Sequence, residues 1–487
     1  MINIKRYGSL CLSAILAAAF ILTPAVKAFA EEGDPAADRE IQRQTCYAEP
    51  TDSNELTNWP QGPAVYADSA IVMDMNSGAI LYGKQIDKQH YPASITKLLT
   101  TLVALDHAKL TDKVEFSQDS ISFLQYGDAH IGMRAGEELT LEDSLYAVLL
   151  ASANEVSYAV AESVGKEMGG DYNTFIEAMN EESKALGCTG SHWTNANGLH
   201  DEQHYTTAHD MARIGAAVYQ KKAFRTISQS LSHTIPVTNL VNEERTFQQK
   251  HKMLWPQNDN YYEYCKGGKT GYTDQARTTL VTMADNGDMQ LVAVVLYDFG
   301  NDAYIDTRAM FDYAYSNFSK ISLKDQKLPE GVKSYEDEDA YIVLPKSAQF
   351  SDVKAEVKED SNKDGSGTVT FTYKGQEVGS VKAAIEKTEE SSAAVFGKKK
   401  DKTTSTVVTG ISKFMKIVIG VVIAVVILLI IIVVLANYRK QIRRRRRKKG
   451  KRIPDGIPEG RRPLSDKGIW KADERRIQHS GDGSVGI

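Results

Sequence analysis

Cysteine is scarce in this chain of 487 residues, which has only four. Cys11 lies inside an apolar N-terminal segment, and the others are Cys46, Cys188 and Cys265. An odd number of remaining cysteines argues against a disulfide framework. We therefore expect isolated thiols that pack as small apolar groups. A pairing of Cys188 with Cys265 stays open, because the sequence does not show whether the fold brings the two together.

Two common signatures are also missing. The run Gly267-Gly268-Lys269-Thr270 ends like a phosphate-binding loop, but Glu263 stands where G-x-x-x-x-G-K-[ST] requires its first glycine. His200 and His204 are four residues apart, yet the glutamate between them comes one position too late for H-E-x-x-H. We therefore expect neither a phosphate loop nor a metal site, and no cofactor. These histidines, with the nearby His209, are expected to form hydrogen bonds in a loop.

Charge is unevenly distributed along the chain. The whole chain carries −5, whereas residues 437–487 hold 17 Lys and Arg against 6 Asp and Glu, a local charge of +11. The preceding apolar run, Ile417 to Ala436, is long enough to span a bilayer. Basic residues directly after a span mark the cytoplasmic side. A buried core helix and a nucleic-acid-binding tail are the alternatives, but stop-transfer and attraction to anionic lipid explain the arginines more simply.

The N-terminus indicates export. Lys5 and Arg6 precede an apolar region from Leu10 to Leu22, and Ala28-Phe29-Ala30 matches an A-x-A cleavage site. A secretory signal peptide cut after Ala30 is expected, with a retained anchor as the alternative. Export and the basic tail agree on one topology: a single-pass membrane protein, with its main domains outside the cell and its C-terminal tail in the cytoplasm.

One short stretch carries a chemical pattern. Pro92 and Ala93 lead into an apolar run, which predicts a helix entered through a proline. Ser94 then lies in the first turn with Lys97 three residues later, so that the hydroxyl and the amine share one helix face. A serine nucleophile needs a base, and a desolvated lysine has the lowered pKa that allows it to serve. Ser-x-x-Lys alone is common, and an ordinary helix start with an exposed lysine is the simpler interpretation.

Two further motifs change this interpretation. Ser152-Ala153-Asn154 follows an apolar run, and Lys269-Thr270-Gly271 follows two glycines. Ser-x-x-Lys, Ser-x-Asn and Lys-Thr-Gly in this order are the motif set of serine β-lactamases and penicillin-binding proteins. From about Val65 to Phe318 the chain resembles a low-molecular-mass penicillin-binding protein, a D-alanyl-D-alanine carboxypeptidase.

The resemblance implies a role for each motif residue. Ser94 is the expected nucleophile and Lys97 its base, while Ser152 and Lys269 relay the proton to the leaving D-alanine. The substrate is then held by five groups: Asn154, Lys269, Thr270, Gly271 and Tyr272. The backbone N–H groups of Ser94 and Tyr272 are the expected oxyanion hole. Peptidoglycan stem peptides are the implied substrates, and β-lactam antibiotics the implied inhibitors.

The chain departs from the family pattern in places. Ala276-Arg277 stands where Ala-Gly is usual, and an arginine there is expected to alter the rim of the site. Glu155 follows Asn154 where aspartate is frequent, and no clear equivalent is found of an arginine that some members place near the substrate carboxylate. A serine β-lactamase and a catalytically weak binding or regulatory protein are the alternative functions. A missing glutamate motif for fast deacylation argues against the first, and the intact motif residues argue against the second.

The predicted fold class is α+β. Strand patterns at 70–75 and 79–82, and again at 231–237, 278–283 and 290–297, flank a mostly helical region at 111–229, and a helix at 306–318 closes the domain. Within the helical region, residues 141–165 are expected to be helical with a break at Ser152. An antiparallel sheet covered by helices, with a helical subdomain, is expected. The predicted parts are a signal peptide 1–30, a polar leader 31–62, a serine peptidase domain 63–320, a small β-domain 321–385, a linker 386–412, a transmembrane helix 413–436 and a basic tail 437–487.

Overall fold

The computed structural model describes residues 35–360 and 365–386. The predicted signal peptide, the transmembrane helix, the basic tail and all but the first residue of the predicted linker lie outside these residues. Within the described part, no helix combines the length and the apolar character that crossing a membrane requires.

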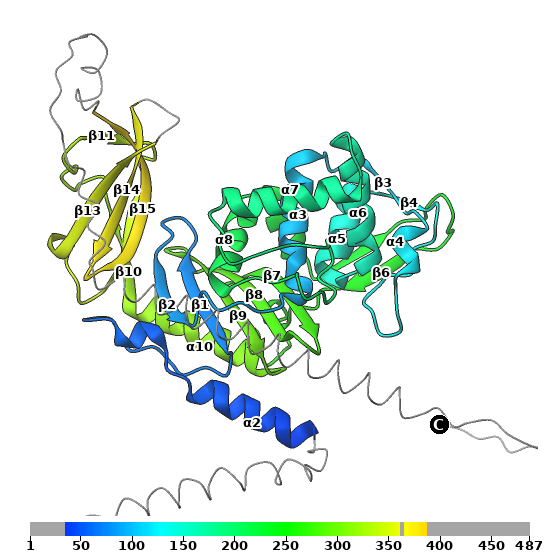
Figure 1. The fold of residues 1–487 in the computed structure, drawn as a ribbon, viewed down its shortest axis with the longest axis horizontal. Helices are drawn as coiled ribbons and strands as arrows, with labels where there is room; N and C mark the ends of the chain where they lie inside the picture. The colour runs from blue at the N-terminus through cyan, green and yellow to red at the C-terminus, as the bar shows by residue number, and fades with distance from the viewer. Residues whose placement is uncertain (1–34, 361–364, 387–487) are drawn as a thin grey trace, which may run out of the picture. The chain divides into compact units, whose positions relative to one another are not determined.

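A five-stranded antiparallel sheet forms the centre of the fold (Figure 1). Its strand order is β2-β1-β9-β8-β7, so the chain's first hairpin pairs with the middle of a later meander. Both predicted hairpins are confirmed, because β1 pairs with β2 and β8 pairs with β9. The strand bounds are β1 Ser69–Asp74, β2 Ile80–Lys84, β7 Cys265–Thr273, β8 Arg277–Asp285 and β9 Gln290–Asp298.

The two faces of this sheet are buried in different cores. Alternate residues of a strand point to opposite faces, and in β9 Val292 and Val294 pack in one core while Ala293 and Val295 pack in the other. The first core joins the sheet to the helical subdomain. The second joins it to α10 (Asp302–Asn317) and to the strands that follow. A strand buried on both faces explains why β9 reads as a continuous apolar run rather than an alternation.

The helical subdomain supplies the first core, and Figure 1 shows its helices above the sheet. The predicted helix at 141–165 is broken around Ser152, as expected, and a π-helical turn precedes the break. The elements, in order, are the 3₁₀ turn η4 Ala93–Thr96, α3 Lys97–His107, β3 Lys113–Glu115, α4 Asp119–Ser122, β4 Glu138–Thr140, α5 Leu141–Tyr146, η5 Ala147–Ala151, α6 Asn154–Glu167, α7 Tyr172–Ala185, α8 Ala208–Tyr219 and α9 Lys222–Ser228.

Two segments differ from what the sequence pattern suggests. The predicted strand at 231–237 forms β5 (Ser232–Ile235), which pairs with β6 (Arg245–Gln248) in a separate hairpin and not in the main sheet. The polar leader contains the helix α2 (Pro35–Ala48) and the 3₁₀ turn η3 (Asp52–Glu55). The sequence pattern did not indicate α2, because this helix is polar and is held in place by polar contacts. One of them is the ion pair between Arg43 and Asp302 of α10.

The strands after α10 share the second core with the main sheet. β10 (Phe318–Ser322) leaves α10 directly and pairs with β12 (Tyr341–Pro345). A four-stranded sheet of order β11-β15-β14-β13 adds its apolar face to the second core. Its strands are β11 Val332–Tyr335, β13 Val353–Glu359, β14 Ser366–Tyr373 and β15 Gln376–Ile385, which confirms the predicted β-structure.

The three cysteines of the described residues are buried free thiols, as the sequence predicted. Burial raises the pKa of Cys188 and Cys265, each to about 12, so both thiols stay protonated at neutral pH. Both therefore act as small apolar packing groups.

Candidate active site

Ser94 and Lys97 meet as the helical spacing predicted. Ser94 lies in the η4 turn, and Lys97 is the first residue of α3. The Lys97 Nζ donates a hydrogen bond to Ser94 Oγ at 3.0 Å. The tighter 3₁₀ turn that precedes α3 brings residues three apart onto one face, and the amine therefore lies within proton-transfer distance of the hydroxyl.

Two glycines allow the backbone to close around Ser94. A Cβ at Gly271 of β7 would lie 2.9 Å from the Ser94 backbone nitrogen, and one at Gly198 would lie 1.9 Å from the Ala93 carbonyl oxygen. The Oγ1 of Thr279 also donates to the Pro92 carbonyl at 2.8 Å, which ties the η4 turn to β8. A bulkier side chain at either glycine would push the serine turn away from the sheet.

The Lys97 ammonium is removed from water without an ion pair. Its side chain is fully buried, and its Nζ also donates to Asn154 Oδ1 at 2.8 Å and to the Asn197 carbonyl at 2.5 Å. Burial, with the charge of Lys250 as a further cause, lowers the pKa of Lys97 to about 7. A large share of Lys97 is therefore neutral near pH 7 and has a lone pair that can accept a proton.

Ser152 and Lys269 form the second pair. Lys269 lies on β7, and its Nζ donates to Ser152 Oγ at 3.0 Å and to the Thr270 carbonyl at 2.7 Å. Ser152 follows the π-helical turn and has a left-handed backbone, with φ 63°. This rare conformation ends the helix and turns the serine towards the sheet. Burial, followed by the charges of Lys97 and Lys250, sets the pKa of Lys269 well below its usual value.

Lys250 is a third lysine of the site, which the sequence pattern did not reveal. It lies just after β6, and its charge acts on both Lys97 and Lys269. Desolvation lowers its own pKa. Among the described residues no carboxylate forms an ion pair with any of the three lysines. No spacing relates Lys250 to the other motifs, so only the fold could place it here.

The remaining predicted residues lie on the same strand. Thr270 and Gly271 follow Lys269 in β7, and the side chain of Tyr272 is 54% exposed, with its hydroxyl donating to Asp274. Asn197 was not among the predicted site residues, although its carbonyl accepts from Lys97. The adjacent Asn197-Gly198 pair is the signal that could have indicated it, because this dipeptide marks a tight turn.

His200, His204 and His209 each contact a different residue. His204 is buried and bonds Thr96 Oγ1 at 2.8 Å, and burial lowers its pKa to about 3, so it is neutral. The His200 ring packs edge-on against Tyr91, and His209 contacts Asp87. The three do not converge on one point, and no cluster of three metal-ligating side chains occurs in the described ranges.

Comparison with known proteins gives a consistent result. The family model described as D-alanyl-D-alanine carboxypeptidase matches residues 56–300, a range that contains all three motifs. The chain is 29% identical to the D-alanyl-D-alanine carboxypeptidase DacF of Bacillus subtilis over 340 residues, which cover 65% of this chain and 80% of that protein. It is 30% identical to DacB2 of Mycobacterium tuberculosis, over 53% of this chain and 84% of that protein.

Solved structures are also similar to this chain. The crystal structure of a D-alanyl-D-alanine carboxypeptidase from Mycobacterium tuberculosis H37Rv is 29% identical and has a TM-score of 0.46. The match covers 54% of this chain and 94% of that one.

Proposed function

The chain belongs to the D-alanyl-D-alanine carboxypeptidase family, and we propose that Ser94 is the nucleophile with which it removes the terminal D-alanine from peptidoglycan stem peptides. The observation that carries this proposal is the contact between Ser94 Oγ and Lys97 Nζ, made by a fully buried lysine whose pKa is about 7. A nucleophile within hydrogen-bond reach of a base of suitable pKa is the arrangement that covalent catalysis requires.

In the first step neutral Lys97 takes the proton of Ser94, and Ser94 Oγ attacks the carbonyl carbon of the penultimate D-alanine. The backbone N–H groups of Ser94 and Tyr272 stabilise the negative charge that develops on the carbonyl oxygen. Asn154, which accepts a hydrogen bond from Lys97, keeps the amine aimed at the serine. Gly271 permits β7 to approach Ser94 closely enough for the two N–H groups to act together.

The second step breaks the peptide C–N bond. The leaving amine takes a proton through Ser152, whose hydroxyl is bonded to Lys269. The product of this step is an ester between Ser94 and the shortened peptide, together with free D-alanine. Water then attacks the ester carbonyl: its oxygen becomes part of the new C-terminal carboxyl group of the peptide, and one of its protons passes through Lys97 to Ser94 Oγ as the ester C–O bond breaks.

Three lysines without a carboxylate partner favour an anionic ligand. Beside burial, the charge of Lys250 lowers the pKa values of Lys97 and Lys269, and the charge of Lys97 also lowers that of Lys269, so a bound carboxylate relieves their repulsion. The C-terminal carboxylate of a stem peptide supplies this charge, with Lys269, Lys250 and the hydroxyl of Thr270 as its donors. The attraction also fixes the direction of the peptide, with its C-terminus at Lys269.

Labelling with a fluorescent penicillin tests the nucleophile. β-Lactams mimic the D-alanyl-D-alanine end, and their leaving group stays tethered in the product, so we expect a long-lived ester on the peptide that contains Ser94. Ser94→Ala should abolish both the label and the release of D-alanine, since the ester cannot form. Circular dichroism on the same variant controls for folding. A label on another serine, or undiminished D-alanine release, overturns the assignment.

The same experiment separates a carboxypeptidase from a β-lactamase. Release of D-alanine from a pentapeptide, with slow loss of the penicillin label, is the carboxypeptidase result. Fast turnover of penicillin with no D-alanine released supports the β-lactamase alternative, and a label without any turnover supports a binding protein.

The proposal for location rests on sequence outside the described residues. We propose that the protein is exported, cleaved after Ala30 and anchored by residues 413–436, with the peptidase outside and the basic tail inside. The A-x-A site and the arginines after the apolar run support this topology. Protease added to intact protoplasts should remove the peptidase domain and spare the tail, whereas a protected peptidase domain would show the reverse orientation.

A further inference from the structure

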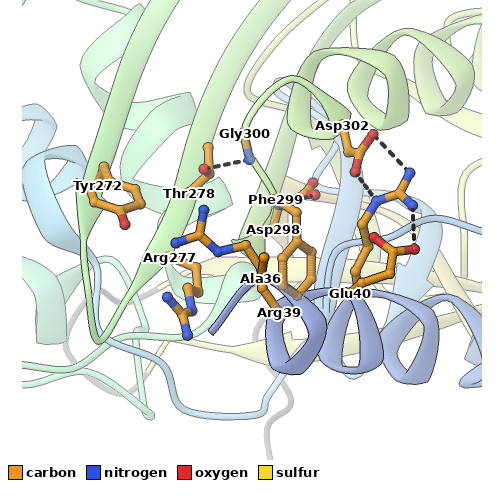
Figure 2. A pocket seen from close by; sticks show the side chains of 11 residues that line it. Ala36, Arg39, Glu40, Tyr272, Arg277, Thr278, Asp298, Phe299, Gly300 and Asp302 are labelled. Carbon is orange, nitrogen blue, oxygen red and sulfur yellow. Dashed lines mark hydrogen bonds and ion pairs between the residues drawn. The ribbon is translucent and has the colours of Figure 1, made fainter. Parts of the chain in front are cut away.

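A cavity of about 420 Å³ lies beside the proposed active site, at the end of β7 (Figure 2). Two elements form most of it. Helix α2 contributes Ala36, Arg39, Glu40 and Arg43, and the sheet with the start of α10 contributes Tyr272, Arg277, Thr278, Asp298, Phe299, Gly300 and Asp302. Helix α2 lies outside the region that matches the family model.

Two guanidinium groups of this cavity have no anionic partner. The Arg39 side chain makes no ion pair or hydrogen bond within the described residues. The Arg277 guanidinium bonds uncharged groups, namely the Gln42 Oε1 at 3.3 Å and the side chains of Tyr297 and Tyr272. The Nε of Arg277 is buried with no hydrogen-bond partner. Figure 2 shows the two guanidinium groups near one another, on the side of the cavity towards Tyr272.

The carboxylates of the cavity do not neutralise this pair. Asp302 and Glu40 are both bonded to Arg43. Asp298 is fully buried, and burial together with the nearby Asp306 holds its pKa well above the usual value, which disfavours its charged form. Arg43 therefore engages both Glu40 and Asp302, and neither carboxylate pairs with Arg39 or Arg277.

The backbone of Arg277 supports a role for its side chain. Its φ is 54°, in the left-handed region where glycine is favoured. A non-glycine residue there costs on the order of 1 kcal/mol or more and persists where the surroundings require it. The side chain extends from this position to helix α2, which places a guanidinium at the mouth of the cavity.

The direction of the substrate connects this cavity to the reaction. With the terminal carboxylate at Lys269 and the scissile carbonyl at the Tyr272 N–H, the peptide runs along β7 from Lys269 towards Thr273. In the sheet register Thr273 lies opposite Arg277. Each strand residue advances by about 3.3 Å, so the third residue from the peptide's C-terminus lies beside Thr273, with its side chain in reach of the cavity.

We propose that Arg39 and Arg277 form a subsite for a carboxylate on the side chain of the residue that precedes the two D-alanines. The subsite rests on the proposed function, because the substrate direction follows from it. Guanidinium groups suit this ligand, since their planar donors match a carboxylate. Helix α2 therefore completes the substrate site and selects stem peptides with an acidic third residue.

Matched substrates test the subsite in the intact protein. N-acetylated tripeptides Xaa-D-Ala-D-Ala, with Xaa either L-α-aminoadipate or its side-chain amide, differ only in the charge of one group. We expect the acid to be favoured in kcat/KM by about fivefold to tenfold, the range for a partly exposed charge-assisted bond. The preference should shrink in 0.5 M salt, which screens exposed charge. Equal kcat/KM for acid and amide would overturn the subsite.

Variants then assign the preference to the two arginines. Arg39→Gln removes a side chain that makes no other bond, so folding should be retained, and the acid-to-amide ratio should fall; the double variant Arg39→Gln/Arg277→Gln should bring it to about one. Arg213→Gln on α8 removes an arginine that is not part of the cavity lining and should keep the wild-type ratio. A ratio that survives the double variant excludes the pair.

Binding to Ser94→Ala protein separates this proposal from the catalytic one. Calorimetry with the same two peptides should show the acid bound more tightly by the same factor, although neither is cleaved. Equal affinities overturn the subsite even if the wild-type protein releases D-alanine. Conversely, tighter binding of the acid supports the subsite even where the wild-type protein releases no D-alanine, a result that counts against the proposed function alone.

Discussion

Each of the two edge strands of the central sheet, β2 and β7, carries one lysine whose side chain is buried. Lys84 ends β2 and Lys269 lies within β7, and both side chains are buried with lowered pKa values. Lys84 Nζ donates to two backbone carbonyls, of Cys46 at 2.6 Å and of Val65 at 2.9 Å. Lys269 donates to a serine hydroxyl and has two other lysines nearby.

Lys84 and Lys269 differ in the chemistry of the groups that accept their hydrogen bonds. Backbone carbonyls cannot pass on a proton, so Lys84 serves to fasten the C-terminal end of α2 and the segment before β1 to the sheet edge. A hydroxyl can donate and accept, and like charges nearby make a bound anion favourable. Burial and a lowered pKa are therefore shared by the structural Lys84 and by Lys269 of the proposed active site, and neither property identifies an active site by itself.

The largest expected effect comes from removing each ammonium in turn. Lys269→Met should lower kcat/KM for D-alanine release by about 10²- to 10³-fold, the loss expected for a desolvated charge that meets a carboxylate. Its free energy of unfolding should stay level or rise, because a buried like-charge contact disappears.

Lys84→Met is the matched control. It leaves two buried carbonyls without a donor, so we expect unfolding to become easier by about 2–4 kcal/mol, with the penicillin acylation rate per folded molecule unchanged. Urea denaturation and stopped-flow acylation measure the two quantities. If Lys84→Met slows acylation while Lys269→Met does not, the roles assigned to Lys84 on β2 and Lys269 on β7 are wrong.

The site was predictable where its signal is local. Ser94 and Lys97 lie within one helical turn, and the Ser152 and Lys269 motifs have a fixed order along the chain, so their convergence followed from the motif set. Lys250 and the docking of α2 depend on contacts between distant segments, such as Arg43 with Asp302, 259 residues apart. Such contacts have no periodicity, and a polar helix held by them looks like a leader.

The fold, too, was predictable where the signal in the sequence is local. The hairpins β1–β2 and β8–β9 have short turns that fix their register. The strand β5 has the same local pattern but pairs with β6 outside the main sheet, and only the surroundings decide that choice.

A glycine pair sharpens the comparison between the two edges. At Gly271 of β7 an added Cβ would lie 2.4 Å from Thr279 Oγ1 and 2.9 Å from the Ser94 nitrogen. At Gly83 of β2 it would meet only side-chain methyl groups, the Cγ2 of Ile86 at 3.2 Å and that of Ile80 at 4.0 Å, and no backbone atom. Gly271→Ala should therefore displace β7 from the serine turn and lower acylation by about 10²-fold, the cost of a misplacement near 1 Å.

Gly83→Ala is expected to leave the acylation rate within about twofold. Both variants should keep the wild-type circular dichroism spectrum, and acylation by penicillin is the measurement for each. A normal rate in Gly271→Ala would mean that the close approach of β7 to Ser94 is not needed for the oxyanion hole.

The last comparison uses pH, to which acylation and stability respond through different lysines. With the pKa of Lys97 at about 7, its neutral fraction, and with it the acylation rate, should be nearly constant above pH 8. Well below pH 7 the rate should fall about tenfold per unit. Lys84→Met should leave this pH profile unchanged, since Lys84 does not contact Ser94.

The free energy of unfolding depends on pH in a different way. The folded pKa values of Lys84, Lys97 and Lys269 all lie below the unfolded value of about 10.4. In that interval the unfolded chain binds more protons, so the contribution of these lysines to the free energy of unfolding rises with pH. Stopped-flow acylation from pH 5 to 9, beside urea denaturation at the same values, measures both. An acylation rate that stays flat from pH 8 to pH 5 excludes Lys97 as the base, whatever the stability does, because a protonated amine has no lone pair with which to take the proton of Ser94.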